Sequence, residues 1–352
     1  MYDELPPTGR VRARKLGLAP GTGVPGPTNT IVDVAGVRVG QVTLHEGTRL
    51  HTGVTAIVPD AVDNAGGRLP AGLFVGNGHG KLVGATQLVE LGEIETPILL
   101  TGTLSAFRAA DALVSYVLAK PGNEHVESVN PVVGETNDGH LSDIRSRPIT
   151  EAHVLQALTS ASSDPVALGC VGAGSGTAAL GFKGGIGSAS RRVDLPGHGT
   201  VTVGVLAQTN FSGTLTVSGV PVTPDEALGD VVDATAPEGN SCMLVVAADA
   251  GLDSRQLTRV ATRAVFGMAP VGSDFAHGSG DYAIAFDTAP AGNLPDAGLN
   301  PIFSAVQEAV AEAILDSLFL ATTTHGVHGH VKHAVPLDFV VEKCRAAGVF
   351  ER

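Results

Sequence analysis

The most distinctive hydrophobic pattern of the chain is an unbroken apolar run at residues 242–248, Cys-Met-Leu-Val-Val-Ala-Ala. A run of this length without a polar interruption predicts a strand that is buried on both faces. The preceding segment, residues 233–240, is rich in turn-forming residues and predicts an exposed, irregular loop. Ser241 stands between the two. The pattern therefore predicts a small nucleophile at the first position of a central strand.

Shorter strands are predicted where apolar residues alternate with polar ones between glycines, a pattern that favours antiparallel or mixed sheets. Six further segments have it: residues 31–43, 52–58, 73–76, 200–207, 215–222 and 282–287. Residues 1–28, by contrast, are rich in Pro, Gly, Arg and Lys. We expect them to form an arm on the surface.

Helical periodicity, with apolar residues three and four positions apart, is clearest at residues 104–119 and 302–321. Thr103 is suited to cap the first of these helices. Residues 154–160 and 256–265 predict two shorter helices. Strands and helices in this order fit two sheets sandwiched between layers of helices.

Composition and charge narrow the class of protein. The net charge of −13 argues against nucleic acid or an anionic membrane as a partner. Aromatic residues make up only 4% and Trp is absent, which predicts a core of aliphatic side chains. The three cysteines are widely spaced and indicate a reducing compartment rather than a disulfide framework. Neither a signal peptide nor a membrane-spanning run is recognisable, so we expect a cytoplasmic protein.

Glycines are densest at residues 169–187, where backbone amides could cradle a phosphate. The phosphate-loop ending is missing, because Lys183 is followed by two glycines, and no acidic residue completes a dinucleotide fingerprint. We interpret the segment as close backbone packing beside a site, with no cofactor.

Four histidines form a second cluster, and such spacing could ligate zinc. They are His325, His328, His330 and His333. No Asp or Cys stands near them in the sequence, so we expect a solvated loop and no metal.

Polar side chains at strand ends supply three further candidates. The run 135–143, which includes Asn137 and His140, follows two apolar valines. Asn210 ends an apolar strand and could donate to a developing oxyanion, although an Asn that caps a turn has the same pattern. Ser279 and Asp281 are two positions apart, so on extended backbone they share one side and could orient an ammonium group. An ordinary turn is the alternative for each.

A serine directly after a Gly-Asn turn suits self-cleavage. The Ser241 hydroxyl would attack the carbonyl of Asn240, the peptide would become an ester, and water would release a new terminal amine. That amine can serve as general base for the same hydroxyl. A serine at a strand start is also ordinary, so a purely structural role stays open.

Several motifs succeed one another along the chain. They are Glu135-Thr136-Asn137-Asp138-Gly139, the stretch 169–187, Gly204-Val205-Leu206-Ala207-Gln208-Thr209-Asn210-Phe211, Gly239-Asn240-Ser241, Ala248-Asp249-Ala250 with Gln256-Leu257, and Gly278-Ser279-Gly280-Asp281. In this order, from about residue 29 to the end, the chain resembles the DmpA/BapA family of self-processing aminopeptidases. This family comprises L-aminopeptidase/D-esterases and β-peptidyl aminopeptidases.

The resemblance implies a fold and a processing event. The fold is α+β, a four-layer αββα sandwich that is similar to Ntn hydrolases but differs in connectivity, formed by a single domain at residues 29–352. Cleavage between Asn240 and Ser241 would give an α chain of residues 1–240 and a β chain of residues 241–352. The processed protomers would assemble as a homotetramer.

The resemblance also assigns site residues by position. Ser241 matches the nucleophile, Asn210 the oxyanion-stabilising residue, and Ser279 the serine that contacts the nucleophile or its amine. Asp281 matches an acidic residue that recognises the free amine of the substrate, where the family carries Glu.

One departure concerns a tyrosine that assists the oxyanion in the family and belongs near residues 135–143. The tyrosines of this chain are Tyr2, Tyr116 and Tyr282, all outside that segment. Asn137 or His140 are the candidates to contact the substrate in its place.

The sequence thus predicts an aminopeptidase that acts on short peptides, amides or esters with a free amine and needs no metal. Two alternatives remain. One is an acyltransferase similar to the ornithine acetyltransferases, although these use Thr where this chain has Ser241. The other is an unprocessed binding or scaffold protein, which the missing tyrosine would favour.

Overall fold

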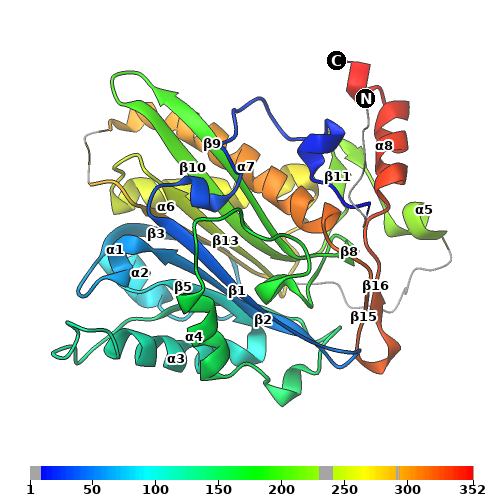
Figure 1. Cartoon of the computed structure of the whole chain (residues 1–352). Coiled ribbons are helices and arrows are strands. Elements are labelled where there is room, and N and C mark those ends of the chain that lie inside the picture. Colours follow the sequence, from blue (N-terminus) through cyan, green and yellow to red (C-terminus); the bar gives the residue numbers. More distant parts are fainter. Residues whose placement is uncertain (1–8, 230–240, 291, 293, 352) are drawn as a thin grey trace.

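The computed structural model describes residues 9–229, 241–290, 292 and 294–351, and these form four layers in the order helices, sheet, sheet, helices (Figure 1). The αββα sandwich predicted from the resemblance is therefore confirmed. The predicted loop 233–240, with Asn240, lies outside the described residues. Within the described ranges, no helix combines the length and apolar character needed to cross a bilayer.

Two sheets form the middle layers. The four-stranded sheet has the order β1-β2-β5-β6, and the six-stranded sheet has the order β4-β3-β14-β13-β10-β9. Pairing is antiparallel except between β5 and β6 and between β13 and β14. The strands are β1 (Val37–Glu46), β2 (Leu50–Pro59), β3 (Leu69–Gly78), β4 (Glu93–Ile94), β5 (Ile98–Gly102), β6 (Val132–Thr136), β9 (Ile186–Leu195), β10 (Gly199–Asn210), β13 (Ser241–Ala248) and β14 (Gly280–Asp287). Three small ribbons pair β7 (Ala178–Ala179) with β8 (Phe182–Lys183), β11 (Thr216–Val217) with β12 (Val220–Pro221), and β15 (Thr324–His325) with β16 (Val331–Lys332).

Helices cover the outer face of each sheet. Helices α3 (Ala106–Leu118) and α4 (Glu151–Thr159) pack on the four-stranded sheet, whereas α6 (Ser254–Phe266) and α7 (Leu299–Phe319) pack on the six-stranded one (Figure 1). The remaining helices are α1 (Asp60–Asp63), α2 (Ala85–Leu91), α5 (Pro224–Leu228) and α8 (Leu337–Ala346).

Strand β13 crosses the middle of the six-stranded sheet, and all its residues are buried. Its side chains alternate between two cores. Cys242 and Leu244 join the core beneath α6 and α7, while Met243 and Val245 join the core between the two sheets. The prediction of a strand buried on both faces is confirmed, and by the same alternation Ser241 faces the space between the sheets.

Helix caps and turns explain why several observed element boundaries differ from the predicted ones. Helix α6 begins at Ser254 because the Asp253 carboxylate accepts a hydrogen bond of 2.7 Å from the Gln256 amide. The strand predicted at 31–43 is wrong at its start, since residues 31–33 form a 3-10 turn and β1 begins only at Val37. The strand predicted at 215–222 is instead the short β11–β12 hairpin.

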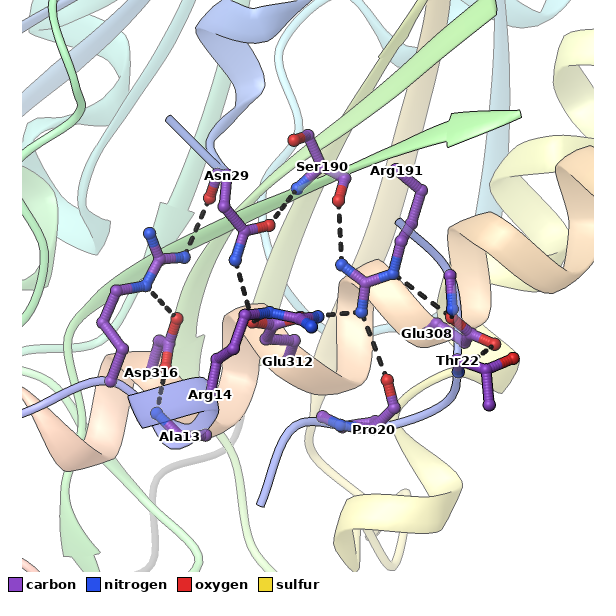
Figure 2. Close-up of polar contacts among 12 residues, drawn as sticks. Ala13, Arg14, Pro20, Thr22, Asn29, Ser190, Arg191, Glu308, Glu312 and Asp316 are labelled. Atoms are coloured by element: carbon purple, nitrogen blue, oxygen red, sulfur yellow. Dashed lines mark hydrogen bonds and ion pairs between the residues drawn. The ribbon is translucent and has the colours of Figure 1, made fainter. Parts of the chain in front are cut away.

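The N-terminal arm is anchored rather than merely laid on the surface. Ala13 and Leu18 are buried in the core beneath α7. Beside them, a cluster of charged groups joins the arm to α7 (Figure 2). Arg12 Nε lies 2.6 Å from Asp316 Oδ2, and Arg14 Nη2 lies 2.6 Å from Glu312 Oε2.

Glu312 is the centre of this cluster. Its carboxylate also accepts hydrogen bonds from Arg191 Nη2 at 2.7 Å and from Asn29 Nδ2 at 2.8 Å (Figure 2). The Glu312 and Arg191 side chains are fully buried. Burial opposes the ionisation of Glu312, but Arg14 and Arg191 outweigh it and hold the pKa of this carboxyl below its ordinary value.

We expect Glu312→Gln to destabilise the fold at pH 7, because it leaves Arg14 without its counter-charge and leaves the buried Arg191 with only the more exposed Glu308. Breaking a buried ion pair on one side costs about 3–5 kcal/mol, which a thermal melt would detect as a lower Tm. Glu308→Gln is the matched control, since the Glu308 side chain is 24% exposed and its loss should matter less. The lowered pKa means that the Glu312 contribution is present above pH 4.5 and is lost as the pH falls through the folded value. Equal melting of wild type and Glu312→Gln at pH 7 would contradict this account.

Candidate active site

Ser241 is the first residue of β13 and lies between two neighbouring strands. Across the antiparallel ladder it pairs with Asn210, the last residue of β10. Across the parallel ladder it pairs with Gly280, the first residue of β14. Directly opposed residues point to the same face of a sheet, so Ser241 and Asn210 present their side chains together.

A cavity of about 610 Å³ opens at this end of the sheets. Its wall is built from loops and strand ends that are distant in sequence. The lining residues are His79, Gly80, Lys81, Thr103, Glu135, Asn137, Gly139, His140, Ile144, Gly176, Ala178, Asn210, Ser241, Gly278 and His330. The structure therefore brings Ser241, Asn210, Asn137 and His140 of the predicted site into one cavity.

The Asn210 amide is held in a defined orientation. Its Oδ1 accepts a hydrogen bond of 3.0 Å from the Ala178 backbone amide. Because that N–H can only donate, the acceptor and donor ends of Asn210 are distinguished. The Asn210 Nδ2 group is buried and has no hydrogen-bond partner among the described residues. A buried, oriented and unsatisfied donor in a cavity is suited to bind an oxyanion.

Glu135 is a site residue that the sequence-based assignment missed. It lies near the end of β6, on the sheet opposite Ser241, and only 2% of it is exposed. Its Oε1 accepts a hydrogen bond of 2.8 Å from the Lys81 amide, and Thr103 donates to its Oε2. The sequence feature that could have identified Glu135 was its position at the end of an apolar strand. The same feature marked its neighbours Asn137 and His140 as candidates.

Glycines bring Glu135 and Ser241 close together. A Cβ atom on Gly280 would lie 2.6 Å from the Gly80 backbone and 3.4 Å from Ser241 Oγ. A Cβ atom on Gly80 would lie 3.3 Å from Glu135 Oε1. The backbone at 80 can thus cross the start of β14 only because both positions lack a side chain, and this crossing places the carboxylate beside the serine.

Ser279 and Asp281 form a pair next to Ser241 but on another face of the sheet. The Ser279 hydroxyl donates to Asp281 Oδ1 at 2.7 Å, and Asn77 Nδ2 donates to Oδ2 at 3.1 Å. Asp281 pairs with Cys242, whose side chain points to the core beneath the helices. Burial raises the pKa of Asp281, against the hydrogen bonds from Ser279 and Asn77. Neither Ser279 nor Asp281 is among the described residues that line the cavity.

The histidine cluster contributes to the cavity wall. The His140 and His330 rings are stacked, with centroids 4.3 Å apart, and His330 Nδ1 donates to the His140 carbonyl at 2.8 Å. In the described part of the chain, no three His, Cys, Asp or Glu side chains converge as metal ligands. The expected solvated loop is therefore partly wrong, because ring stacking ties His330 to His140.

The glycine-rich segment passes behind the cavity at close range. A Cβ atom on Gly176 would lie 2.0 Å from the His51 carbonyl oxygen. Lys183 is fully buried and donates to the Gly184 and Gly174 carbonyls at 2.9 and 3.2 Å. Burial lowers the pKa of this lysine. This geometry agrees with the interpretation of the segment as backbone packing, since the Lys183 ammonium group donates its hydrogen bonds to carbonyls of the same segment.

No tyrosine hydroxyl is placed at the cavity by the described residues. Tyr116 donates to Asp63 at 2.9 Å, and Tyr282 donates to the Gly80 carbonyl at 2.8 Å. Tyr282 therefore supports the crossing backbone at 80, and Tyr2 lies outside the described residues.

Comparisons with known proteins agree with this site. The model of peptidase family S58 matches residues 29–332. A β-peptidyl aminopeptidase, BapA of Sphingosinicella microcystinivorans, is 38% identical over 92% of this chain and 89% of its own length. These similarities favour the aminopeptidase hypothesis over the acyltransferase and scaffold alternatives.

Two solved structures share the fold. The PH0078 protein from Pyrococcus horikoshii OT3 superposes with a TM-score of 0.89 at 42% identity, covering 96% of this chain and 99% of that one. The L-aminopeptidase D-Ala-esterase/amidase from Ochrobactrum anthropi has a TM-score of 0.86 at 32% identity with the same coverage. The latter is described as a prototype for the serine aminopeptidases and a variant of the Ntn hydrolase fold.

Asn210→Asp should lower kcat by about 100- to 1000-fold, the loss typical of removing one oxyanion donor. The variant keeps the acceptor for the Ala178 amide, but it replaces the donor with a carboxylate oxygen, which repels an oxyanion. Kinetics on aminoacyl p-nitroanilides would be normalised to the fraction of processed protein. Asn300→Asp serves as the control, because Asn300 is exposed, lies outside the cavity and should lose far less. A kcat near that of wild type would exclude Asn210 as the oxyanion donor.

Proposed function

The chain belongs to peptidase family S58, and we propose that it cleaves itself before Ser241 and then releases the N-terminal residue from short peptides, amides or esters. The observation that carries this proposal is the pairing of Ser241 with Asn210. It sets a serine hydroxyl beside an oriented amide donor in a cavity of about 610 Å³. The family membership and the aminopeptidase similarity support the same reaction.

Self-cleavage would begin with attack of Ser241 Oγ on the Asn240 carbonyl. The C–N bond breaks as the serine oxygen takes the acyl group, and the nitrogen of Ser241 gains a proton to become an amine. Water then hydrolyses the ester, which leaves a carboxylate on Asn240 and a free hydroxyl on Ser241. The result is an amine and a hydroxyl on one residue, the pairing that N-terminal nucleophiles use.

Substrate hydrolysis would reuse the same groups. The Ser241 amine, with an ordinary pKa of about 7.7–8.0, takes the hydroxyl proton near neutral pH. Ser241 Oγ attacks the scissile carbonyl, whose oxygen receives the Asn210 Nδ2 hydrogen bond. The amine returns the proton to the leaving nitrogen, and water releases the acyl group. Ser279, held by Asp281, would orient the catalytic amine from the neighbouring strand.

Glu135 is our choice for the group that binds the substrate ammonium. It is a buried carboxylate within the cavity, whereas Asp281 is held by Ser279 and Asn77 away from the lining. Lys81 Nζ lies 3.9 Å from Glu135 Oε1 and is 45% exposed, so its charge is screened by water and can move aside. A carboxylate at one fixed position would select substrates that have a free amine.

We also propose that the protein is cytoplasmic and that the processed protomers assemble as a homotetramer. The three cysteines are free, which fits a reducing cytoplasm. The homotetramer is supported by the family resemblance.

Intact-mass analysis tests the processing step. Wild-type protein should give two fragments, residues 1–240 and 241–352, and Ser241→Ala should give one uncut chain. Ser241→Thr keeps a hydroxyl and should retain at least slow cleavage. An uncut wild-type chain, purified and incubated at neutral pH, would overturn the proposal.

Glu135→Gln should raise KM for aminoacyl p-nitroanilides by about 10- to 100-fold, because it removes a charged partner of the ammonium group. The effect on kcat should be smaller. Asp281→Asn is the contrasting variant, since it alters the carboxylate outside the cavity and should leave KM within a few-fold of wild type. If Asp281→Asn instead gives the large KM effect, the ammonium site belongs to Asp281.

A further inference from the structure

A second cavity adjoins the first and is not used by the reaction described above. It measures about 530 Å³ and shares Gly139 and Ile144 with the cavity that holds Ser241. The histidine cluster borders both cavities: His328 lines the second cavity and His330 lines the first. The remaining lining residues are Thr48, Arg49, Ser142, Asp143, Arg145 and Val327.

Two guanidinium groups and one carboxylate set the charge of this second cavity. Arg49 is already engaged, with its Nη2 2.5 Å from Glu46 Oε2 and its Nη1 3.6 Å from Asp143 Oδ2. Arg145 is exposed and makes no ion pair or hydrogen bond with any residue that the structure describes. Glu46 and Asp143 thus share the Arg49 guanidinium, and Arg145 is the guanidinium of this lining that has no carboxylate partner among the described residues and can pair with an anion.

The anion can be identified from the proposed reaction. A short peptide with a free amine also has a C-terminal carboxylate on the part that leaves. With the ammonium at Glu135 and the scissile carbonyl at Ser241, the leaving part extends along the remaining wall of the first cavity. Gly139 and Ile144 are part of that wall, and they are the residues shared with the second cavity.

We propose that the second cavity binds the C-terminal carboxylate of short peptide substrates, with Arg145 as the residue that contacts it. The subsite rests on the proposed aminopeptidase function and makes its substrate class narrower. Guanidinium pairs with carboxylate through two parallel hydrogen bonds, which gives direction as well as attraction. Peptides just long enough to span both cavities are preferred over longer ones and over amides.

The experiment compares substrates that share one N-terminal residue: a p-nitroanilide, free-acid peptides of two to five residues, and the same peptides as C-terminal amides. The proteins are processed wild type, Arg145→Ala, Arg145→Glu and Arg145→Lys. Arg345→Ala is the matched control, because Arg345 is an exposed arginine of α8 that lies outside both cavities.

Wild type should show a lower KM for one length of free-acid peptide than for its amide. Arg145→Ala should raise that KM about fivefold, the scale of a partly exposed charge pair, and leave the p-nitroanilide unchanged. Arg145→Glu should raise it further, Arg145→Lys should recover part of it, and added salt should weaken the preference.

Two outcomes distinguish a failure of the carboxylate subsite from a failure of the proposed function. If wild type hydrolyses the p-nitroanilide but treats acids and amides alike at every length, or if Arg145→Ala shifts both equally, the carboxylate subsite is wrong and the proposed function stands. If wild type hydrolyses none of the substrates, the proposed function is wrong and the subsite falls with it.

Discussion

Asn210 and Ser241 face each other across the ladder between β10 and β13, and the rest of the site depends on that register. A slip of β13 by one residue would turn Ser241 away from Asn210 to the opposite face, where Cys242 now packs beneath the helices. The register is fixed by buried residues on both strands, along the whole pairing from Val203–Ala248 to Asn210–Ser241. The geometry of the nucleophile and its oxyanion donor is therefore a consequence of core packing rather than of a local loop.

The same arrangement explains how two proposed fragments would stay together. The part after residue 240 contributes β13 and β14, and these lie between β3 and β10 of the earlier part. Separation would break two ladders in the centre of one sheet. The Glu312 cluster adds a second tie, because Arg14 and Arg191 come from the earlier part and Glu312 from the later one. A buried ion pair of this kind gives direction to the contact even where its net stabilisation is small.

The sequence predicted what depends on local pattern. The strand after Ser241, the long helices and the place of Asn210 at a strand end followed from an apolar run, a helical period and a polar residue after apolar ones. The proposed ammonium site could not be found in this way, because the environment of Glu135 depends on contacts with Lys81 and Thr103, which are distant in the sequence. For a similar reason residues 31–33 were misassigned, since Asp33 accepts hydrogen bonds from two preceding backbone amides and closes a turn that hydrophobicity does not reveal. The burial of the arm likewise arises from partners about 300 residues away.

The two carboxylates near Ser241 come from different sheets and differ in what surrounds them. Asp281 stands on the helix side, where burial raises its pKa and where Ser279 and Asn77 occupy its oxygens. Asp281 is not among the residues that line the cavity, so in the proposed mechanism its effect is exerted through Ser279. Glu135 lies between the sheets, where Thr103 and the Lys81 backbone amide hold its carboxylate at the cavity and the half-exposed Lys81 ammonium group is 3.9 Å away. Because an Asp is one methylene shorter than the Glu expected at position 281, its reach is confined to these neighbours. In the proposed mechanism, amine recognition and nucleophile support are thus divided between the two sheets, with Glu135 on β6 of one and Asp281 on β14 of the other.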